Sequence, residues 1–377
     1  MASPLPDPVP LSQVRRVLVT KLRHHGDVLL TSPVFTTLAR AIPAAQIDAL
    51  VYAETAQMLE GHPAISQVHT IDRAWKTRGL ATQAREEWRL LRRLRERRYD
   101  LLVHLTPHPR GLTLALVLRP RWSVTRERSK RSGLSARLWR RGFTHFFRQP
   151  KAATRHTVEA NLDALRRIGI YPDPSDKRLI LVPGREAEGK VLALMAQHGL
   201  ATRGFIQLHP GSRWLFKCWP PERTAALIDR IVGLGYTVAI TGAPDERERA
   251  LVAAIIATIG PAARECTRDL AAQLSLRELA ALTGHARAFV GVDSAPMHIA
   301  AAMGTPTVVL FGPSGELEWG PWGVAARVIT SDAHPCRPCG LDGCGGGKVS
   351  ECLTTLSVER VYDGLRSLLA ETSRETV

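Results

Sequence analysis

The chain has 377 residues, more than one hydrophobic core usually supports, so its length predicts two domains. A hydrophobic fraction of 45% argues against disorder, and the apolar runs fall short of the ~20 residues that span a bilayer, so no transmembrane helix is predicted. The net charge of +16 lies in residues 73–155, where 23 Lys and Arg stand against 5 Asp and Glu.

The first half of the chain alternates between strand and helix patterns, starting with an apolar, β-branched run. We predict strands at residues 14–20, 46–52, 68–71 and 99–105, a turn at 21–27, and helices at 28–40 and 83–98. The helix at 28–40 is expected to begin directly at the turn. Strands that alternate with helices are typical of a parallel α/β sheet.

The second half repeats this alternation after a segment in which the strand and helix pattern is interrupted. A helical segment at 156–168 and a loop-prone stretch that ends at Pro183-Gly184 predict a linker, and hence domains at 1–180 and 181–377. Further strands are predicted at residues 205–208, 237–241, 288–292 and 307–311. We therefore expect an α/β protein with two doubly wound, Rossmann-like domains that face a central cleft, with ligands at the carboxyl ends of the strands.

The first candidate anion site lies where the predicted strand 288–292 ends. Asp293 and Ser294 form a small polar turn, and a helix pattern begins at Ala295. The first N–H groups of a helix have no intrahelical partner and its dipole favours negative charge, so Ser294 and Ala295 are predicted to bind a phosphate. Alternatively, Asp293 or Ser294 only caps the helix and His298 is a core histidine.

A second candidate phosphate loop follows the strand at 205–208. Gly211 lets the backbone approach a ligand closely, Ser212 supplies a hydroxyl, and Lys217 supplies a mobile positive charge for a diphosphate. The turn Thr241-Gly242, at another strand end, is a candidate wall for an adenine ring. Neither loop contains GxxxxGK[ST] or GxGxxG, which removes the main support for a P-loop kinase or a dehydrogenase.

The turn at 21–27 supplies the candidate general base. A sugar transfer needs a carboxylate that accepts the proton of the incoming hydroxyl, and an aspartate with an ordinary pKa of ~3.9 is ionised at neutral pH. Asp27 is our candidate, and His24 and His25 are alternatives. Asp27 otherwise only caps the following helix.

Four of the six cysteines lie close together in the sequence. Cys336 and Cys339 form a C-x2-C pair, and Cys344 and Cys352 follow in a glycine-rich stretch. A structural zinc site is one interpretation. The spacing lacks a second C-x2-C pair, so free thiols in a reducing compartment are favoured and no metal or cofactor is predicted.

Several motifs occur in a fixed order along nearly the whole chain. They are Lys21 with Gly26-Asp27-Val28-Leu29-Leu30-Thr31-Ser32-Pro33, His156-Thr157-Val158-Glu159-Ala160-Asn161, His209-Pro210-Gly211-Ser212, Lys217 with Trp219-Pro220, Gly291-Val292-Asp293-Ser294-Ala295-Pro296-Met297-His298, Gly304-Thr305-Pro306 and Phe311-Gly312-Pro313. This order resembles the ADP-heptose:lipopolysaccharide heptosyltransferases of glycosyltransferase family 9, especially the heptosyltransferase III branch.

The resemblance implies a GT-B fold and an inverting, metal-independent transfer from ADP-heptose to a Kdo or heptose hydroxyl of the lipopolysaccharide inner core. It implies that Asp27 is the general base. For the domain at 181–377, we expect the C-terminal helix of this chain to pack back on the N-terminal domain. The implied diphosphate contacts are Ser212, Lys217, Ser294, Ala295 and His298, with Asp293 near the donor sugar and Leu274 at the adenine pocket.

The resemblance also gives the basic segment a partner, because the inner core carries carboxylates and phosphates and lies at the anionic inner-membrane surface. By hypothesis, the contacts with the acceptor or the membrane are Lys21, Arg73, Lys76, Arg78 and the basic group at 119–141 that includes Arg126. Residues 1–12 are proline-rich and lack a secretory-signal pattern, so we expect a cytoplasmic protein, peripheral at the cytoplasmic face of the inner membrane.

Two other readings remain open at this point. One is a different GT-B glycosyltransferase, or an epimerase of similar fold, that uses a UDP-sugar. The other is a basic protein that binds a polyanion without catalysis, since a field of this size attracts nucleic acid as well as lipid. The basic segment lacks a recognisable nucleic-acid-binding module, so no nucleic acid is expected as a partner.

Overall fold

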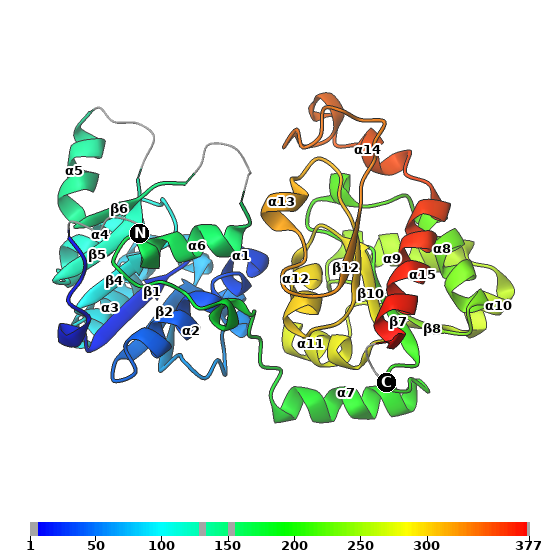
Figure 1. The fold of residues 1–377 in the computed structure, drawn as a ribbon, viewed down its shortest axis with the longest axis horizontal. Coiled ribbons are helices and arrows are strands. Elements are labelled where there is room, and N and C mark those ends of the chain that lie inside the picture. Colours follow the sequence, from blue (N-terminus) through cyan, green and yellow to red (C-terminus); the bar gives the residue numbers. More distant parts are fainter. Residues whose placement is uncertain (1–6, 128–132, 150–154, 375–377) are drawn as a thin grey trace. The chain divides into compact units, whose positions relative to one another are not determined.

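The structure is a computed structural model that describes residues 7–127, 133–149 and 155–374 (Figure 1). The hypotheses that concern residues 1–6 and 128–132 lie outside the described residues. The chain divides into two compact units, Met1–Ile180 and Leu181–Val377. Each unit contains one six-stranded parallel sheet with the same type of strand order.

The first unit is built around the sheet order β3-β2-β1-β4-β5-β6. The strands are β1 (Arg16–Thr20), β2 (Gln46–Tyr52), β3 (Gln67–Ile71), β4 (Leu101–His104), β5 (Trp122–Arg126) and β6 (His145–Phe147). The α-helices are α1 (His25–Leu29), α2 (Ser32–Ala41), α3 (Leu80–Glu96), α4 (Arg110–Leu118), α5 (Leu134–Gly142) and α6 (Thr157–Arg166). Short 3-10 turns are η1 (Leu11–Gln13), η2 (Ala53–Met58), η3 (Arg73–Lys76) and η4 (Pro174–Lys177).

Helices cover both faces of the first sheet. On one face α3, α4 and α5 pack side by side, and Leu94, Leu114 and Trp139 from these helices meet Leu18 and Leu102 of the sheet. The helices α2 and α6 contact each other. β4 is buried along its whole length, and its first three residues, Leu101 to Val103, are apolar, as expected for a central parallel strand.

The second unit has the sheet order β12-β11-β10-β7-β8-β9. Its strands are β7 (Phe205–His209), β8 (Thr237–Ile240), β9 (Thr267–Asp269), β10 (Ala288–Val292), β11 (Thr307–Leu310) and β12 (Ala326–Ile329). Its helices are α7 (Arg185–Gln197), α8 (Pro221–Gly233), α9 (Glu246–Thr258), α10 (Pro261–Glu265), α11 (Leu276–His285), α12 (Ala295–Ala302), α13 (Glu316–Trp319), α14 (Glu351–Thr354) and α15 (Val358–Arg374), with 3-10 turns η5 (Leu215–Lys217) and η6 (Cys344–Gly346).

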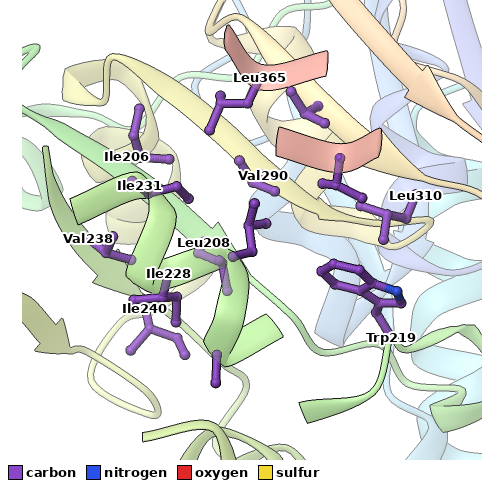
Figure 2. Close-up of a cluster of buried hydrophobic side chains, with 14 of the residues drawn as sticks. Ile206, Leu208, Trp219, Ile228, Ile231, Val238, Ile240, Val290, Leu310 and Leu365 are labelled. Carbon is purple, nitrogen blue, oxygen red and sulfur yellow. The ribbon is translucent and has the colours of Figure 1, made fainter. Parts of the chain in front are cut away.

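The core of the second unit joins sheet, α8 and α15 in one apolar cluster (Figure 2). Leu208 and Val290 of the central strands meet Ile228 of α8 and Leu365 of α15 in this cluster. The final helix α15 packs against α8, β11 and β12 of its own unit. Trp219 lies at the edge of the cluster and donates a hydrogen bond from Nε1 to the carbonyl of Leu356, 3.1 Å away.

The predicted α/β class with two Rossmann-like units is confirmed, but the element predictions fail in two places. The helix predicted at 28–40 is wrong, because α1 already contains Asp27 and the chain breaks before α2. Thr31 Oγ1 donates to the Val28 carbonyl at 2.6 Å, and Pro33 cannot donate a backbone hydrogen bond. The short outer strands β5, β6, β9 and β12 were not predicted.

The strand orders locate one switch point in each sheet, where the chain leaves the central strand toward opposite edges. In the first unit this point lies between β1 and β4, and in the second unit it lies between β7 and β10. Loops beyond the carboxyl ends of the two central strands diverge there and leave room for a ligand. No helix of the described chain has the length and apolar character needed to cross a membrane.

Candidate functional site

At the switch point of the second unit, the loops after β7 and β10 bring together residues that are distant in the sequence. Lys217 Nζ lies 2.6 Å from Asp293 Oδ2, and the two side chains are 21% and 10% exposed. Ser212 is buried on the loop after β7. The predicted phosphate residues Ser212 and Lys217 and the acidic Asp293 therefore lie on the segments that follow two adjacent strands, β7 and β10.

The N-terminus of α12 contains the other predicted diphosphate contacts. Ser294 occupies the N-cap position but makes no side-chain capping bond, and its buried Oγ has no hydrogen-bond partner. Of the two residues named in the alternative, Ser294 is the N-cap residue, although without a side-chain capping bond, and Asp293 pairs with Lys217. His298 is buried within α12. The first amides of α12, including Ala295, give the site its positive end of a helix dipole.

A buried polar network holds the turns after β7 and β8. His209 Nδ1 lies 3.0 Å from Thr241 Oγ1, and the backbone N–H of Ala243 donates to Glu248 Oε2 at 2.8 Å. His209 Nε2 lies 3.5 Å from the same Glu248 oxygen. Burial favours the protonated form of Glu248, but His209 and the Ala243 amide outweigh it and hold the pKa of the carboxyl below its ordinary value.

Glu248 also explains why the loop after β7 contains Gly211. A Cβ at position 211 would lie 2.3 Å from Glu248 Oε2, so a side chain there would displace the carboxylate. Sequence analysis missed Glu248, because one glutamate in the helical run of α9 gives no sign that it is buried.

The two predicted adenine-pocket positions lie beside β8 and α11. Gly242 follows β8, and its carbonyl accepts a hydrogen bond from the Ala272 amide at 3.0 Å. Leu274 packs against an apolar cluster of the same unit and directly precedes Ser275, which caps α11 in a capping box with Glu278.

In the first unit, Asp27 lies in the first turn of α1, just beyond the carboxyl end of β1. Its carboxylate is 12% exposed, and Oδ1 lies 3.6 Å from Arg23 Nε and 3.9 Å from Lys21 Nζ. The N-cap residue of α1 is His24, so Asp27 does not cap this helix. His25 Nε2 contacts the Glu54 carbonyl oxygen at 2.8 Å.

The predicted acceptor residues fall into two groups. Arg126 ends β5 and lies close enough to Lys21 to lower the pKa of that lysine, an effect that ranks after the larger effects of burial, Asp27 and Arg23. Arg73 and Lys76 line a pocket of about 510 Å³. Arg78 also pairs with a carboxylate, since its Nη2 lies 3.6 Å from Asp72 Oδ2.

This pocket also contains candidate site residues that the sequence analysis did not name. It is lined by Tyr52, Arg73, Trp75, Lys76, His108 and Arg110, among others. The Arg73 guanidinium lies over the Tyr52 ring, 3.9 Å from its centroid. Burial, Arg110, Lys76 and Arg73 lower the pKa of His108 from its ordinary value. Two of the three cations already have carboxylate partners, since Arg73 Nε lies 3.3 Å from Glu54 Oε1 and Arg110 pairs with Glu87, so the pocket contains both basic and acidic groups.

The four clustered cysteines do not form a metal centre in the described residues. Cys336, Cys339 and Cys344 are exposed, Cys352 is buried, and all four are free thiols. Across residues 7–127, 133–149 and 155–374, no group of three or more His, Cys, Asp and Glu side chains is arranged to hold a metal ion. The zinc interpretation therefore has no site in the described structure.

Comparison with known proteins identifies the family. The sequence model of glycosyltransferase family 9 (heptosyltransferase) matches residues 87–349. The chain is 32% identical over 305 residues to lipopolysaccharide heptosyltransferase 3 of Escherichia coli, covering 80% of this chain and 84% of that protein.

Two solved structures share the two-unit fold. A family 9 glycosyl transferase from Veillonella parvula has a TM-score of 0.80 at 24% identity and covers 95% of this chain and 98% of its own. The E. coli heptosyltransferase WaaC with ADP-2-deoxy-2-fluoro heptose has a TM-score of 0.68 at 19% identity and covers 93% and 99%. On the family match and the 32% identity, the chain belongs to glycosyltransferase family 9, the heptosyltransferases.

Proposed function

We propose that this protein transfers a heptose from ADP-heptose to a hydroxyl of the lipopolysaccharide inner core, as the names of its relatives suggest for them. The observation that carries the proposal is the Lys217–Asp293 pair beside the first turn of α12. A cation, a free helix N-terminus and a buried hydroxyl that lacks a partner are the groups that a diphosphate needs.

In the proposed donor complex, the diphosphate lies against the amides of Ser294 and Ala295, with Ser294 Oγ as a further donor. Lys217 turns from Asp293 toward the phosphates, and Asp293 is then available to a sugar hydroxyl. Ser212 borders the same space from the loop after β7. The adenine lies between the turn Thr241–Gly242 and Leu274. The hydrogen bonds around Glu248 hold the turn in place.

The proposed reaction is a single displacement with inversion at the anomeric carbon. The acceptor oxygen forms a bond to that carbon from the face opposite the diphosphate. The bond from carbon to the diphosphate oxygen breaks, and ADP leaves with its electron pair. Asp27 takes the proton of the attacking hydroxyl. Lys217 and the α12 amides stabilise the charge that develops on ADP, a role that a divalent metal performs in other transferases, so we propose metal independence.

The acceptor is proposed to bind to the first unit through its carboxylates and phosphates. Lys76 and Arg73, beside His108, supply one cationic surface, and Arg126 supplies another near Lys21. Arg73 and Arg78 are weaker candidates than Lys76, because their guanidinium groups already pair with Glu54 at 3.3 Å and with Asp72 at 3.6 Å.

We further propose that the outer face of α3, α4 and α5 rests on the anionic membrane surface from the cytoplasm. Several basic residues of the segment are already paired internally, among them Arg97 with Asp48 and Arg110 with Glu87. The outer face nevertheless exposes Trp88 by 59%, Leu116 by 51% and Leu138 by 43%, next to exposed arginines. Apolar side chains among arginines are typical of an interfacial surface.

The experiment that tests the transfer uses ADP-heptose and heptose-truncated lipopolysaccharide, with mass analysis of the released core oligosaccharide. The wild-type protein should add one heptose in the presence of EDTA. Asp27→Asn should lower kcat by about 10²-fold or more while the Kd for ADP stays within about twofold, because only the proton acceptor is lost.

The matched control is Asp173→Asn, an exposed carboxylate that caps η4 and that asparagine replaces equally well. Asp173→Asn should leave transfer unchanged. Near wild-type transfer by Asp27→Asn would show that another group is the base. Transfer from a UDP-sugar in preference to ADP-heptose would overturn the donor assignment, and loss of activity in EDTA that Mg²⁺ restores would overturn metal independence.

A further inference from the structure

The motif at residues 156–161 has no part in the site described so far. It forms the start of α6, where His156 caps the helix by accepting a hydrogen bond from the Val158 amide. The last residue of the motif, Asn161, is buried. A buried amide side chain is costly unless its donors and acceptors are paired, so its partners indicate what the position requires.

Both ends of the Asn161 amide are bonded to the segment that contains Asp27. Nδ2 donates to the carbonyl of Leu30 at 3.0 Å, and Leu30 is the C-cap residue of α1. Oδ1 accepts from Lys21 Nζ at 3.2 Å. Asn161 therefore joins the end of α1 to the residue that immediately follows β1.

Lys21 carries this connection onward to Asp27. Its side chain is 8% exposed, and Nζ lies 3.9 Å from Asp27 Oδ1. Burial lowers the pKa of Lys21, and Asp27 opposes that effect. The ammonium group lies between the Asn161 amide and the Asp27 carboxylate, and an 8% exposed side chain has little surface left for an acceptor sugar.

Arg23 approaches Asp27 from the solvent side. Its side chain is 54% exposed, and Nε lies 3.6 Å from the same carboxylate oxygen. The two cations therefore differ in environment: Lys21 is buried and bonded to α6, whereas Arg23 is more than half exposed and can also contact a bound acceptor. This contrast provides a matched control within one site.

We propose that Asn161 and Lys21 are positioning residues that fix the Asp27 carboxylate, Lys21 from beside it and Asn161 through both Lys21 and the end of α1. This assignment rests on the proposed role of Asp27 as the base, and it gives Lys21 a different role from the acceptor contact expected above. A base displaced by about 1 Å loses roughly 10²-fold in rate. The acceptor and donor are bound by other groups, so their affinities are independent of this clamp.

The test measures kcat, the KM for truncated lipopolysaccharide and the Kd for ADP in Lys21→Met, Asn161→Leu and Arg23→Met. We expect Lys21→Met and Asn161→Leu to lower kcat by about 10- to 100-fold, with KM and Kd within about twofold. Arg23→Met should raise the KM for the acceptor more than it lowers kcat. A higher KM with unchanged kcat in Lys21→Met would make Lys21 an acceptor contact and overturn the proposal.

A double variant separates this proposal from the proposed role of Asp27. If Lys21 acts only through the carboxylate, adding Lys21→Met to Asp27→Asn causes no further loss in single-turnover rate. A further tenfold loss in the double variant would show that Lys21 acts independently and would refute the clamp. Near wild-type transfer by Asp27→Asn alone would instead refute the role of Asp27.

Conservative variants keep the test informative if the apolar variants fail to fold. Asn161→Asp preserves the Oδ acceptor for Lys21 but removes the Nδ2 donor to Leu30, and Lys21→Arg preserves the charge. Each should recover part of the kcat lost in its apolar counterpart while the thermal unfolding midpoint stays close to wild type. Full activity in both Asn161→Asp and Asn161→Leu would contradict the proposal.

Discussion

Replacing Lys217 by methionine should weaken the binding of ADP through two effects that the structure separates. The substitution removes a positive charge from the proposed diphosphate site. It also leaves the Asp293 carboxylate, which lies 2.6 Å from Lys217 Nζ and is 10% exposed, as an unpaired anion beside the first turn of α12. Both effects weaken the binding of a diphosphate.

The magnitude follows from the partial burial of the pair. Removing one partner of a fully buried ion pair costs about 3–5 kcal/mol. Lys217 is 21% exposed and solvent screens part of the interaction, so we expect a loss of about 1–3 kcal/mol. That loss corresponds to a Kd for ADP about 5- to 150-fold higher than wild type.

A double variant identifies how much of the loss is repulsion by Asp293. In Lys217→Met combined with Asp293→Asn, the unpaired anion is gone, and ADP affinity should recover by about tenfold relative to Lys217→Met alone. Isothermal titration calorimetry of all three variants measures this coupling. The control is Lys190→Met on α7, whose 60% exposed ammonium pairs with Glu186 and should not affect ADP.

Two results would refute this reasoning. If Lys217→Met binds ADP as tightly as wild type, the diphosphate does not lie at this pair. If the losses of the two single variants simply add in the double variant, Lys217 and Asp293 do not act on the same ligand group. Thermal unfolding of each variant identifies a change in ADP affinity that stems only from a damaged fold.

Two further predictions concern stability and the membrane. Asp48 is fully buried and accepts from Tyr99 and Arg97 at 2.7 and 2.9 Å, so Asp48→Asn should lower the free energy of unfolding by about 3 kcal/mol. Burial favours protonated Asp48, but its hydrogen-bond donors hold the pKa of this carboxyl below 3.8. The stabilisation by Asp48 is therefore present above pH 3.8 and is lost as the pH falls further. Urea unfolding of Asp48→Asn should lack this acid dependence. Binding to vesicles with anionic lipid should weaken by more than tenfold between about 0.05 and 0.5 M salt, and Trp88→Ser should weaken it at every salt concentration; salt-independent binding would contradict the electrostatic component.

The sequence predicts the strands in the central part of each sheet well because they are buried along most of their length. The range predicted at 46–52 is that of β2, and the range at 288–292 is that of β10. The edge strand β3 was predicted at 68–71, but other outer strands, such as β9, were not. Thr267–Asp269, for example, has three half-exposed or exposed polar residues and no apolar run, and its strand conformation depends on pairing with β8.

In the candidate site, residues on strand-end turns could be predicted from the sequence, whereas contacts between distant residues could not. Strand ends followed by small polar turns locate Asp27, Ser212 and Ser294 on particular loops, because parallel strands present their carboxyl ends at one edge. Contacts between distant residues have no local signal. Lys217 and Asp293 are 76 positions apart, and neither the pairing nor the buried position of Glu248 follows from spacing.

The polar network around Glu248 has a consequence for how a nucleotide is received. His209, Thr241 and the Ala243 amide are held together by hydrogen bonds within the protein, with Gly211 packed against the Glu248 carboxylate. A binding site that is already ordered loses little conformational entropy when the nucleotide binds. More of the free energy of the contacts therefore contributes to affinity. Removing a hydrogen bond of this network should therefore make the entropy of nucleotide binding more unfavourable, even when every contact with the nucleotide is kept.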